Sequence, residues 1–272
     1  MNRLLPGVRI LMVCGGKGGV GKSTVAAHIA MSLAAAGVRT GLLDADFQGP
    51  SLPVLFGTRE RPLVRNGRIS PVVRAGVRLM STGLLADASR ALAWKGPLLR
   101  GALRQLARDV DWGDVSTLVI DTPPGTGEVH MALADLLDIS AAVVVTTPQR
   151  MALEDTRRCV TMLARLGIDI PAVVQNMAHY SCPCCGERTE LFPNAGLTEA
   201  LLAETGYPGA RLVELPLLPE IASAADRGVP SALGGADPAS AADKAFASLA
   251  DLLRGDDPAR PILPPLQEGR TS

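Results

Sequence analysis

Ten residues near the start of the chain read Gly15-Gly16-Lys17-Gly18-Gly19-Val20-Gly21-Lys22-Ser23-Thr24. They follow an apolar run, Val8 to Cys14, and lead into a helical pattern. Residues 16–23 fit G-x-x-x-x-G-K-[ST], where glycines let backbone N–H groups surround phosphate oxygens at the positive end of a helix. The pattern predicts a nucleotide site, with Lys22 on the β- and γ-phosphates and Ser23 on Mg²⁺.

The loop also contains a second lysine, Lys17. The chain has only four lysines (17, 22, 95 and 244) among 27 Lys and Arg, so half of them lie in this loop. Because lysine offers a compact point charge and arginine a planar fork, both positions are predicted to need an ammonium group. The alternative is a chance glycine-rich turn, and the order strand, loop, helix argues against it.

The composition excludes several classes of protein. The 272 residues are 47% hydrophobic and only 3% aromatic, with 27 basic and 27 acidic side chains. This balance predicts a sizeable core and argues against attraction to nucleic acid or membrane surfaces. No stretch approaches the roughly 20 apolar residues of a membrane span, and the start does not resemble a secretory signal. Five cysteines in no disulfide pattern favour a reducing cytoplasm.

Apolar β-rich runs alternate with longer helical patterns along the chain. This alternation predicts an α/β fold of the P-loop NTPase type, with a mostly parallel sheet covered by helices on both faces. The expected strands are Val8–Cys14, Val38–Asp44, Val77–Met80, Thr117–Asp121, Ala141–Thr146, Ala172–Asn176 and Arg211–Leu215. The expected helices span 23–36, 97–109, 128–137, 152–166, 196–204, 219–226 and 238–254.

We expect one ATPase domain over residues 1–254 and a disordered tail over 255–272, which is rich in Gly, Asp, Pro and Arg. Residues 58–78 carry six arginines and are expected to form a solvated hairpin; a docking patch for an acidic partner is the alternative. Right-handed crossovers bring the carboxyl ends of the parallel strands to one edge of the sheet. We therefore expect that edge to be the active one.

Two carboxylates, Asp44 and Asp46, end the second predicted strand at this edge. Residues two apart on a strand project from the same side, so both are expected to face the phosphates. One would orient or deprotonate the attacking water, and the other would hold a water on Mg²⁺. The alternative is that both carboxylates cap a turn and the next helix.

A third carboxylate, Asp121, follows the apolar strand Leu118-Val119-Ile120 and precedes Thr122-Pro123-Pro124-Gly125-Thr126-Gly127. An aspartate after such a strand has the Walker-B arrangement and would hold Mg²⁺ directly or through water. The amide near Gly125 is expected to sense the γ-phosphate, which would make the loop a switch.

A cysteine cluster follows the sixth predicted strand, in Asn176-Met177-Ala178-His179-Tyr180-Ser181-Cys182-Pro183-Cys184-Cys185-Gly186. The C-x₂-C pair Cys182 and Cys185 indicates metal ligation or redox chemistry, but zinc or a 4Fe–4S cluster needs about four ligands. Either two chains each donate this pair, or His179 and the three cysteines surround one zinc. Inert thiols on a surface loop are the third possibility. The remaining histidines, His28 and His130, form no hydrolase triad.

Taken together, these motifs resemble a known family. Lys17 to Ser23 resembles the deviant Walker A of the partition ATPases and the nitrogenase iron protein. Four further segments resemble the Mrp/ApbC iron–sulfur cluster carriers. They are Asp44-Ala45-Asp46-Phe47-Gln48-Gly49-Pro50-Ser51, Trp94-Lys95-Gly96-Pro97, Asp121 to Glu128, and Cys182 to Glu187. The resemblance covers roughly residues 8–235, and partition ATPases lack the cysteine element.

The resemblance implies a homodimer that bridges one 4Fe–4S cluster with Cys182 and Cys185 of each chain, loaded by a cluster donor and delivered to apoproteins. It implies slow ATP hydrolysis in which Lys17 reaches the partner's nucleotide, Asp46 handles the water and Asp121 holds magnesium. It places Asn176 on the adenine, Pro216 to Glu220 near the base, and the phosphates on Gly16, Lys17, Gly18, Gly19, Val20, Gly21, Lys22, Ser23 and Thr24.

Cys184 departs from the family pattern, because it occupies the variable position between the two ligands and would permit ligand exchange.

Two other interpretations of the function stay open. One is a positioning ATPase that binds membrane or DNA, against which the charge-balanced terminal helix argues. The other is an ATPase with a structural zinc site.

Overall fold

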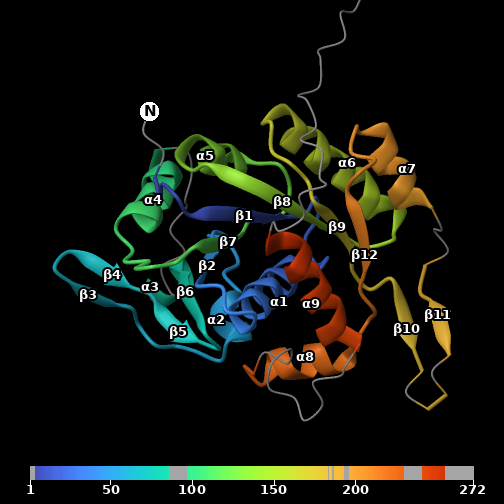
Figure 1. Ribbon diagram of the computed structural model, residues 1–272, viewed down its shortest axis with the longest axis horizontal. Helices are drawn as coiled ribbons and strands as arrows, with labels where there is room; N and C mark the ends of the chain where they lie inside the picture. Colours follow the sequence, from blue (N-terminus) through green and yellow to red (C-terminus); the bar gives the residue numbers. More distant parts are fainter. Residues whose placement is uncertain are drawn as a thin grey trace, which may run out of the picture.

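The computed structural model describes residues 4–85, 97–182, 184–185, 187–192, 196–229 and 241–254. Its centre is an eight-stranded sheet in the order β12-β9-β8-β1-β7-β2-β6-β5 (Figure 1). Neighbouring strands are parallel except β5 and β6. The strands are β1 (Arg9–Cys14), β2 (Thr40–Asp44), β5 (Val72–Arg74), β6 (Val77–Ser81), β7 (Thr117–Asp121), β8 (Ile139–Thr146), β9 (Ala172–Gln175) and β12 (Arg211–Glu214).

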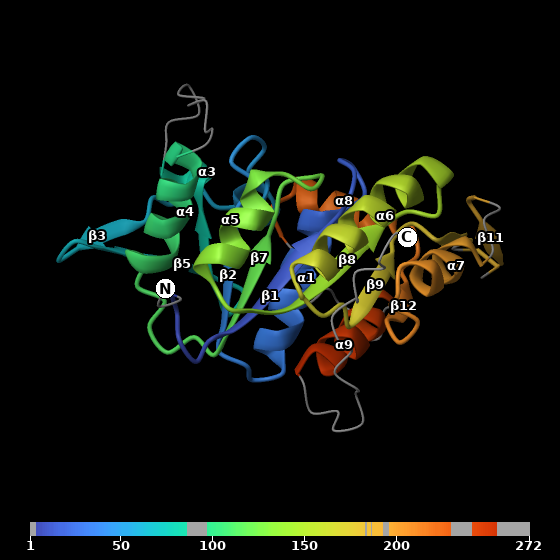
Figure 2. The same cartoon turned by 90° about the horizontal axis from the view of Figure 1, so that it is seen from above.

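Helices cover both faces of this sheet, and Figure 2 shows the resulting layers. One core cluster joins the sheet to α4 (Pro97–Arg108), α5 (Glu128–Leu136), α6 (Arg150–Arg165) and α7 (Leu197–Glu204). The other joins it to α1 (Lys22–Ala35), α2 (Leu52–Leu55), α3 (Thr82–Leu85), α8 (Pro219–Asp226) and α9 (Ala241–Arg254). The predicted α/β class is confirmed.

Alternation along the central strands explains the two cores. In β1, Ile10, Met12 and Cys14 enter one cluster, whereas Leu11 and Val13 enter the other. Successive side chains of a strand point to opposite faces, so a strand buried on both sides must be apolar throughout. That is why the central strands appear in the sequence as continuous apolar runs.

Helix α1 is buried along most of its length, because it lies between the sheet and α9. Small side chains such as Ala26, Ala27 and Ala30 are fully buried there, which lets the helix approach both neighbours closely. His28 stacks on Phe246 of α9 with ring centroids 4.5 Å apart, so it contributes to the packing of the two helices.

Two antiparallel hairpins extend from the central sheet. The first pairs β3 (Leu63–Arg65) with β4 (Arg68–Ser70) and confirms the hairpin expected within residues 58–78. The second pairs β10 (His179–Ser181) with β11 (Arg188–Glu190) and carries the cysteine cluster. The sequence indicated only a loop there, because strands this short have no measurable periodicity.

The predicted strands and helices are all present in the described residues, with ends displaced by a few residues. The helix expected at 152–166, for example, starts two residues earlier, at Arg150. The short helices α2 and α3 were not predicted, since four residues are too few for a helical pattern.

Some residues of the predicted motifs lie outside the described residues, namely Trp94, Lys95, Gly96, Pro183, Gly186 and the tail 255–272. The domain division therefore stays a prediction. None of the described helices is both long and apolar enough to cross a membrane.

Candidate nucleotide site and cysteine hairpin

The glycine-rich loop connects β1 to α1, and its glycines are required by close contacts. A Cβ on Gly16 would lie 2.2 Å from the backbone carbon of Asp155 in α6, and one on Gly21 would lie 2.3 Å from Asn176 Nδ2. Gly19 and Gly21 have φ values of 83° and 89°, a region costly for other residues. The loop is therefore held against α6 and the end of β9.

Lys22 begins α1 and is buried, with only 7% of its surface exposed. A buried ammonium needs a nearby anion or a polar ligand. Asp121, the last residue of the neighbouring strand β7, is close enough for the charge of Lys22 to offset part of the rise in its pKa that burial causes. Lys17 is half-buried, beside the exposed Gly18 and Gly19.

The carboxylates Asp44 and Asp121 are register partners at the ends of β2 and β7, and both are fully buried. Burial raises the pKa of Asp44 to about 7, and the charge of Asp121 adds to the shift. Burial likewise raises the pKa of Asp121 to about 6, although Lys22 and the Ser23 hydroxyl lower it. Two desolvated carboxylates this close store unfavourable energy that a cation would relieve.

The two carboxylates differ in their hydrogen bonds. Asp44 Oδ2 accepts from Ser81 Oγ at 2.9 Å and from the Leu52 amide at 3.3 Å. Both oxygens of Asp121 are buried without a partner of hydrogen-bonding geometry among the described residues. Since Ser23 lies close enough to affect its pKa, Asp121 and Ser23 fit the ligand set for Mg²⁺. Ser81 was not predicted as a site residue, although its position at the carboxyl end of β6 places it at the same edge of the sheet as the predicted site residues.

Asp46 lies in the turn after β2 and is half-buried. Its Oδ1 accepts from the amides of Gln48 and Gly49 at 3.2 and 3.1 Å, so the turn-capping alternative is correct for this residue. Its charge also raises the pKa of Asp121, so the turn places it beside the predicted magnesium ligand. The two interpretations are thus compatible.

The loop after Asp121 is joined by hydrogen bonds to the end of β1 and to the glycine-rich loop. Thr122 Oγ1 donates to the Val13 carbonyl at 2.8 Å, and the Gly125 amide donates to the Gly15 carbonyl at 3.0 Å. Gly125 has φ 91°, which suits glycine.

His130, two residues into α5 after Glu128, is fully buried, and burial lowers its pKa to about 4. It is therefore neutral at pH 7.

Asn176 follows β9 and touches the glycine-rich loop directly. Its Nδ2 donates to the Val20 carbonyl at 2.9 Å, and its backbone amide donates to Thr146 at 2.8 Å. The structure thus brings Lys17, Lys22, Ser23, Asp46, Asp121 and Asn176, all predicted site residues, to one edge of the sheet.

The cysteines lie at the end of the β10–β11 hairpin, which projects from the body of the molecule (Figure 1). Cys182 is half-buried, whereas Cys184 and Cys185 are exposed. Hydrogen bonds from the amides of Cys185 and Cys184 lower the pKa of the Cys182 thiol, which favours the thiolate that binds metals. The other two cysteines, Cys14 and Cys159, are fully buried.

His179 is not placed to complete a single-chain zinc site. It lies on β10, three residues before Cys182. Among the described residues, no group of three or more His, Cys, Asp or Glu side chains forms a metal-binding cluster. Within the described part of one chain, the hairpin thus offers cysteines without further ligands.

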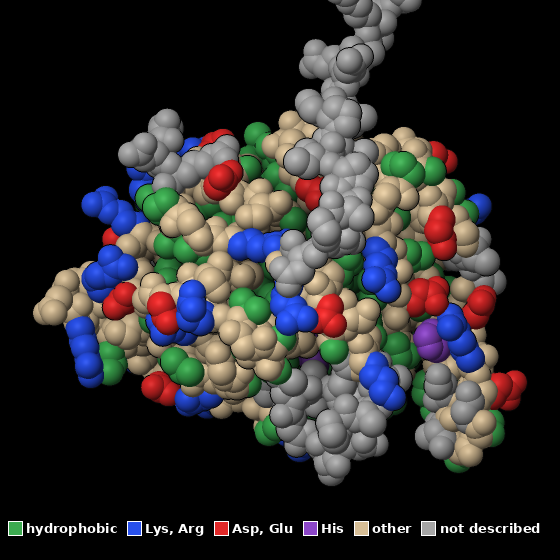
Figure 3. All heavy atoms as spheres, in the orientation of Figure 1, with side chains coloured by type: hydrophobic (Ala, Val, Ile, Leu, Met, Phe, Trp, Pro, Cys, Tyr) green, Lys and Arg blue, Asp and Glu red, His purple; other side chains and the backbone are tan. Residues whose placement is uncertain are grey.

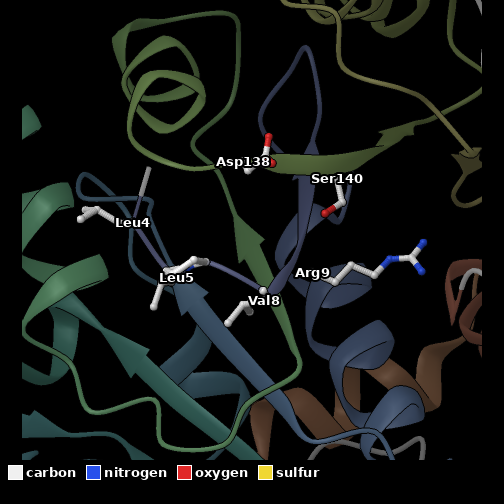
Figure 4. Close-up of a pocket in the computed structure, with 8 residues that line it drawn as sticks. Leu4, Leu5, Val8, Arg9, Asp138 and Ser140 are labelled. Atoms are coloured by element: carbon white, nitrogen blue, oxygen red, sulfur yellow. The ribbon is translucent and has the colours of Figure 1, made fainter. Parts of the chain in front are cut away.

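A cavity of about 620 Å³ opens at the opposite edge of the sheet (Figure 4). It is lined by the segment from Leu4 to Arg9 together with Asp138 and Ser140. Arg9 Nη1 is bonded to the Arg254 carbonyl at 2.7 Å, and Ser140 Oγ accepts from the Ile10 amide at 3.1 Å. Its lining includes none of the predicted site residues.

The family model whose description is "ParA: NUBPL iron-transfer P-loop NTPase" matches residues 8–254. The chain is 44% identical to an iron–sulfur cluster carrier protein of Pseudomonas fragi over 84% of its own length and 79% of that protein. It is 38% identical to an Arabidopsis thaliana protein named "iron-sulfur protein required for NADH dehydrogenase, mitochondrial", over 90% and 78% of the two lengths.

Solved structures agree with this match. A nucleotide-binding protein of Archaeoglobus fulgidus in complex with ADP has a TM-score of 0.70 and 35% identity, over 81% of this chain and 86% of that one. The cell-division ATPase MinD of Pyrococcus furiosus has a TM-score of 0.67 at 22% identity, over 90% and 98%, which supports the fold alone.

Proposed function

The chain belongs to the ParA family of NUBPL iron-transfer P-loop NTPases, and from this we propose that it is an ATP-dependent carrier of a 4Fe–4S cluster. ATP would bind at the glycine-rich loop, and the cluster would bind between two copies of the chain. The observation that carries the proposal is the pair of half-buried Cys182 and exposed Cys185 on a hairpin that starts three residues after Asn176.

The nucleotide half of the proposal rests on the buried charges of the P-loop edge, the edge of the sheet at which β1, β2 and β7 end and the glycine-rich loop begins. Lys22 and the amides of residues 16–24 would hold the phosphates, and Asn176 would contact the adenine. Ser23 and Asp121 would hold Mg²⁺, which supplies charge neutralisation at the phosphates. The buried oxygens of Asp121 support this assignment, because burial raises the pKa of this carboxyl despite the nearby Lys22 and Ser23, and a bound cation would favour its charged form.

For hydrolysis, Asp46 would orient the attacking water, since its turn places it beside Asp121 at the half-buried rim of the site. Lys17 would reach the nucleotide of the partner chain, which makes hydrolysis depend on dimer formation. Its half-buried position next to exposed glycines leaves the side chain near the surface at which a partner would dock. We expect turnover to be slow, so that ATP acts mainly as a conformational switch.

The dimer follows from the ligand count at the hairpin. A 4Fe–4S cluster takes about four thiolates, and Cys182 with Cys185 supplies two per chain. Two large apolar side chains, Met131 and Met151, are 55% and 72% exposed in the first turns of α5 and α6. Both helices begin at the P-loop edge, so these methionines would be covered in a dimer that joins two such edges.

The cluster would be cargo, received from a donor protein and passed to apoproteins. A reducing compartment such as the cytoplasm suits five cysteines that are all free in the structure. We propose no nucleic-acid or membrane partner, because basic and acidic side chains are interspersed on the face shown in Figure 3 and the chain has no net charge.

The proposal is tested by anaerobic reconstitution with iron and sulfide, followed by quantification of iron, sulfide and zinc and by transfer to an apo-ferredoxin. We expect a brown protein that absorbs near 400 nm and activates the acceptor. A matched double variant, Cys182→Ser with Cys185→Ser, should bind ATP normally and contain only background iron. Zinc in the protein purified without oxygen, with no cluster uptake, would instead support a structural zinc site.

A further inference from the structure

The cysteine hairpin and the glycine-rich loop are joined by a very short segment. Asn176, which is bonded to the loop, is separated from β10 by only Met177 and Ala178. Three residues span at most about 10 Å, so the segment has little slack to absorb a displacement at either end.

Each end of this segment is fixed by several contacts. At the loop end, Asn176 Nδ2 donates to the Val20 carbonyl at 2.9 Å, and a Cβ on Gly21 would lie 2.3 Å from the same nitrogen. At the hairpin end, the Ala178 amide donates to Leu215 at 2.9 Å, and the Leu217 amide donates to the His179 carbonyl at 2.7 Å. The segment is thus clamped between the loop and the stretch that follows β12.

Met177 sits between these two clamps with φ 56°. The left-handed region is unfavourable for a residue with a side chain, and such residues persist only where the surroundings over-determine the backbone. A displacement of the Val20–Gly21 backbone would therefore be passed through Asn176 to the strained Met177 rather than absorbed by free rotation.

A second connection holds the outer strand of the hairpin to the same region. Arg188 of β11 donates to Glu214 Oε2 at 2.7 Å, and Gln175 Nε2, one residue before Asn176, donates to Glu214 Oε1 at 3.3 Å. Both strands of the hairpin are thereby linked to the end of β9. The hairpin cannot be displaced as a unit without changing contacts at this point.

We propose that Asn176 and Met177 are positioning residues through which the nucleotide on the glycine-rich loop sets the position of Cys182 and Cys185. The inference rests on the proposed function and adds the route by which its two sites are coupled. Asn176 acts here through its amide nitrogen and Met177 through its backbone, and neither contacts the cluster.

The test is the alkylation rate of the hairpin thiols in the reduced full chain, measured by peptide mass spectrometry with iodoacetamide. Rates are compared without nucleotide and with Mg²⁺ and a saturating non-hydrolysable ATP analogue, saturation being verified for each variant. Cys14 and Cys159 are fully buried and should contribute little background. In the wild type we expect the analogue to change the rates at Cys182 and Cys185 severalfold.

Two variants interrupt the link in different ways. Asn176→Asp keeps the side-chain size but cannot donate to the Val20 carbonyl, and Met177→Gly removes the constraint on the backbone. Each should abolish the response to the analogue. Asn66→Gly is the matched control, because Asn66 also has a positive φ, 51°, on the distant β3–β4 hairpin; it should respond like the wild type.

The proposal is overturned if the wild type shows no response to the analogue, or if the two variants respond as strongly as the wild type. Because alkylation uses the apoprotein, these outcomes do not depend on cluster binding. Failure of the proposed function, seen as absent iron uptake, is therefore distinguishable from failure of the link.

Discussion

The P-loop edge and the cysteine hairpin belong to one chain but are built on opposite principles. At the P-loop edge, Lys22, Asp44 and Asp121 are buried, and each is held by the central sheet or by α1. At the hairpin, Cys184 and Cys185 are exposed between two three-residue strands, which in the described part of the chain pair only with each other. The first region is surrounded by its own fold, and the second faces outward.

This difference indicates which site one chain can complete. Buried charges need partners that are fixed before the ligand arrives, and the sheet provides the fixed positions. A pair of thiolates at the surface needs further ligands from elsewhere, which suits cargo that must be taken up and released. The predictions below separate the two regions, beginning with the largest effect.

Lys22→Ala should abolish ATP hydrolysis, with a loss of about 100-fold or more, because it removes the buried cation that would hold the phosphates. Iron uptake at the hairpin in the absence of nucleotide should be unchanged. Steady-state phosphate release and iron quantification check both statements, with the exposed Lys244→Ala as control. Equal loss of iron uptake would show that the two regions are not separable.

Cys182→Ser alone should reduce cluster content to a small fraction of the wild-type value, whereas Cys184→Ser should leave most of it. The Cys182 thiol is half-buried and receives the amide hydrogen bonds that favour its thiolate. Absorbance near 400 nm after reconstitution is the measurement. If Cys184→Ser is the more damaging variant, ligand exchange within the hairpin is real and the assignment of the pair is wrong.

Asp44 and Asp121 should lower the stability of the protein without nucleotide as the pH rises from about 4 to about 7, whereas the buried His130, with a pKa of about 4, acts in the opposite direction up to about pH 6.5. Asp121 and Asp44 have folded-state pKa values of about 6 and about 7 against 3.8, so the unfolded chain loses these protons first. Asp121→Asn should therefore be more stable than the wild type at pH 8, by about 2–3 kcal/mol, and equal to it near pH 4.

Urea denaturation at the two pH values measures this difference. The control is Asp226→Asn at an exposed position of α8, which should change neither value. If Asp121→Asn were destabilising at pH 8, the attraction of Lys22 and the Ser23 hydroxyl to the carboxylate would outweigh its desolvation, against this prediction.

Gly16→Ala should destabilise the protein by about 1–3 kcal/mol, because its Cβ would overlap the Asp155 backbone. Gly18→Ala has open space around its Cβ and an ordinary φ, so its unfolding free energy should match the wild type within error. Thermal denaturation of the pair compares a packed and an open position of the same loop. Equal stability of the two variants would contradict the packing of the loop on α6.

The smallest effect is expected at the hairpin surface. Arg188→Ala removes an ion pair with Glu214 whose partners are 53% and 38% exposed. Such pairs contribute less than about 1 kcal/mol, so the melting temperature should barely change. A large destabilisation would mean that the hairpin is part of the cooperative core.

The same contrast explains how much was predictable from sequence. The sheet, its helices and the convergence of Lys22, Asp46, Asp121 and Asn176 follow from continuous apolar strands, which fix where parallel strands end. The β10–β11 hairpin, the partners of Asp44 and the contact of Asn176 with Val20 were not predictable. They depend on pairings between distant residues in segments too short to carry a periodic pattern.

The central claim is that two copies of this chain share one cluster through Cys182 and Cys185 of each copy. Native mass spectrometry of the reconstituted protein, kept anaerobic with Mg²⁺ and a non-hydrolysable ATP analogue, tests it directly. The claim predicts the mass of two chains with one 4Fe–4S cluster and nucleotide, and loss of the cluster in the Cys182→Ser, Cys185→Ser variant. A single chain that retains its metal, or a cluster that persists in that variant, would contradict it.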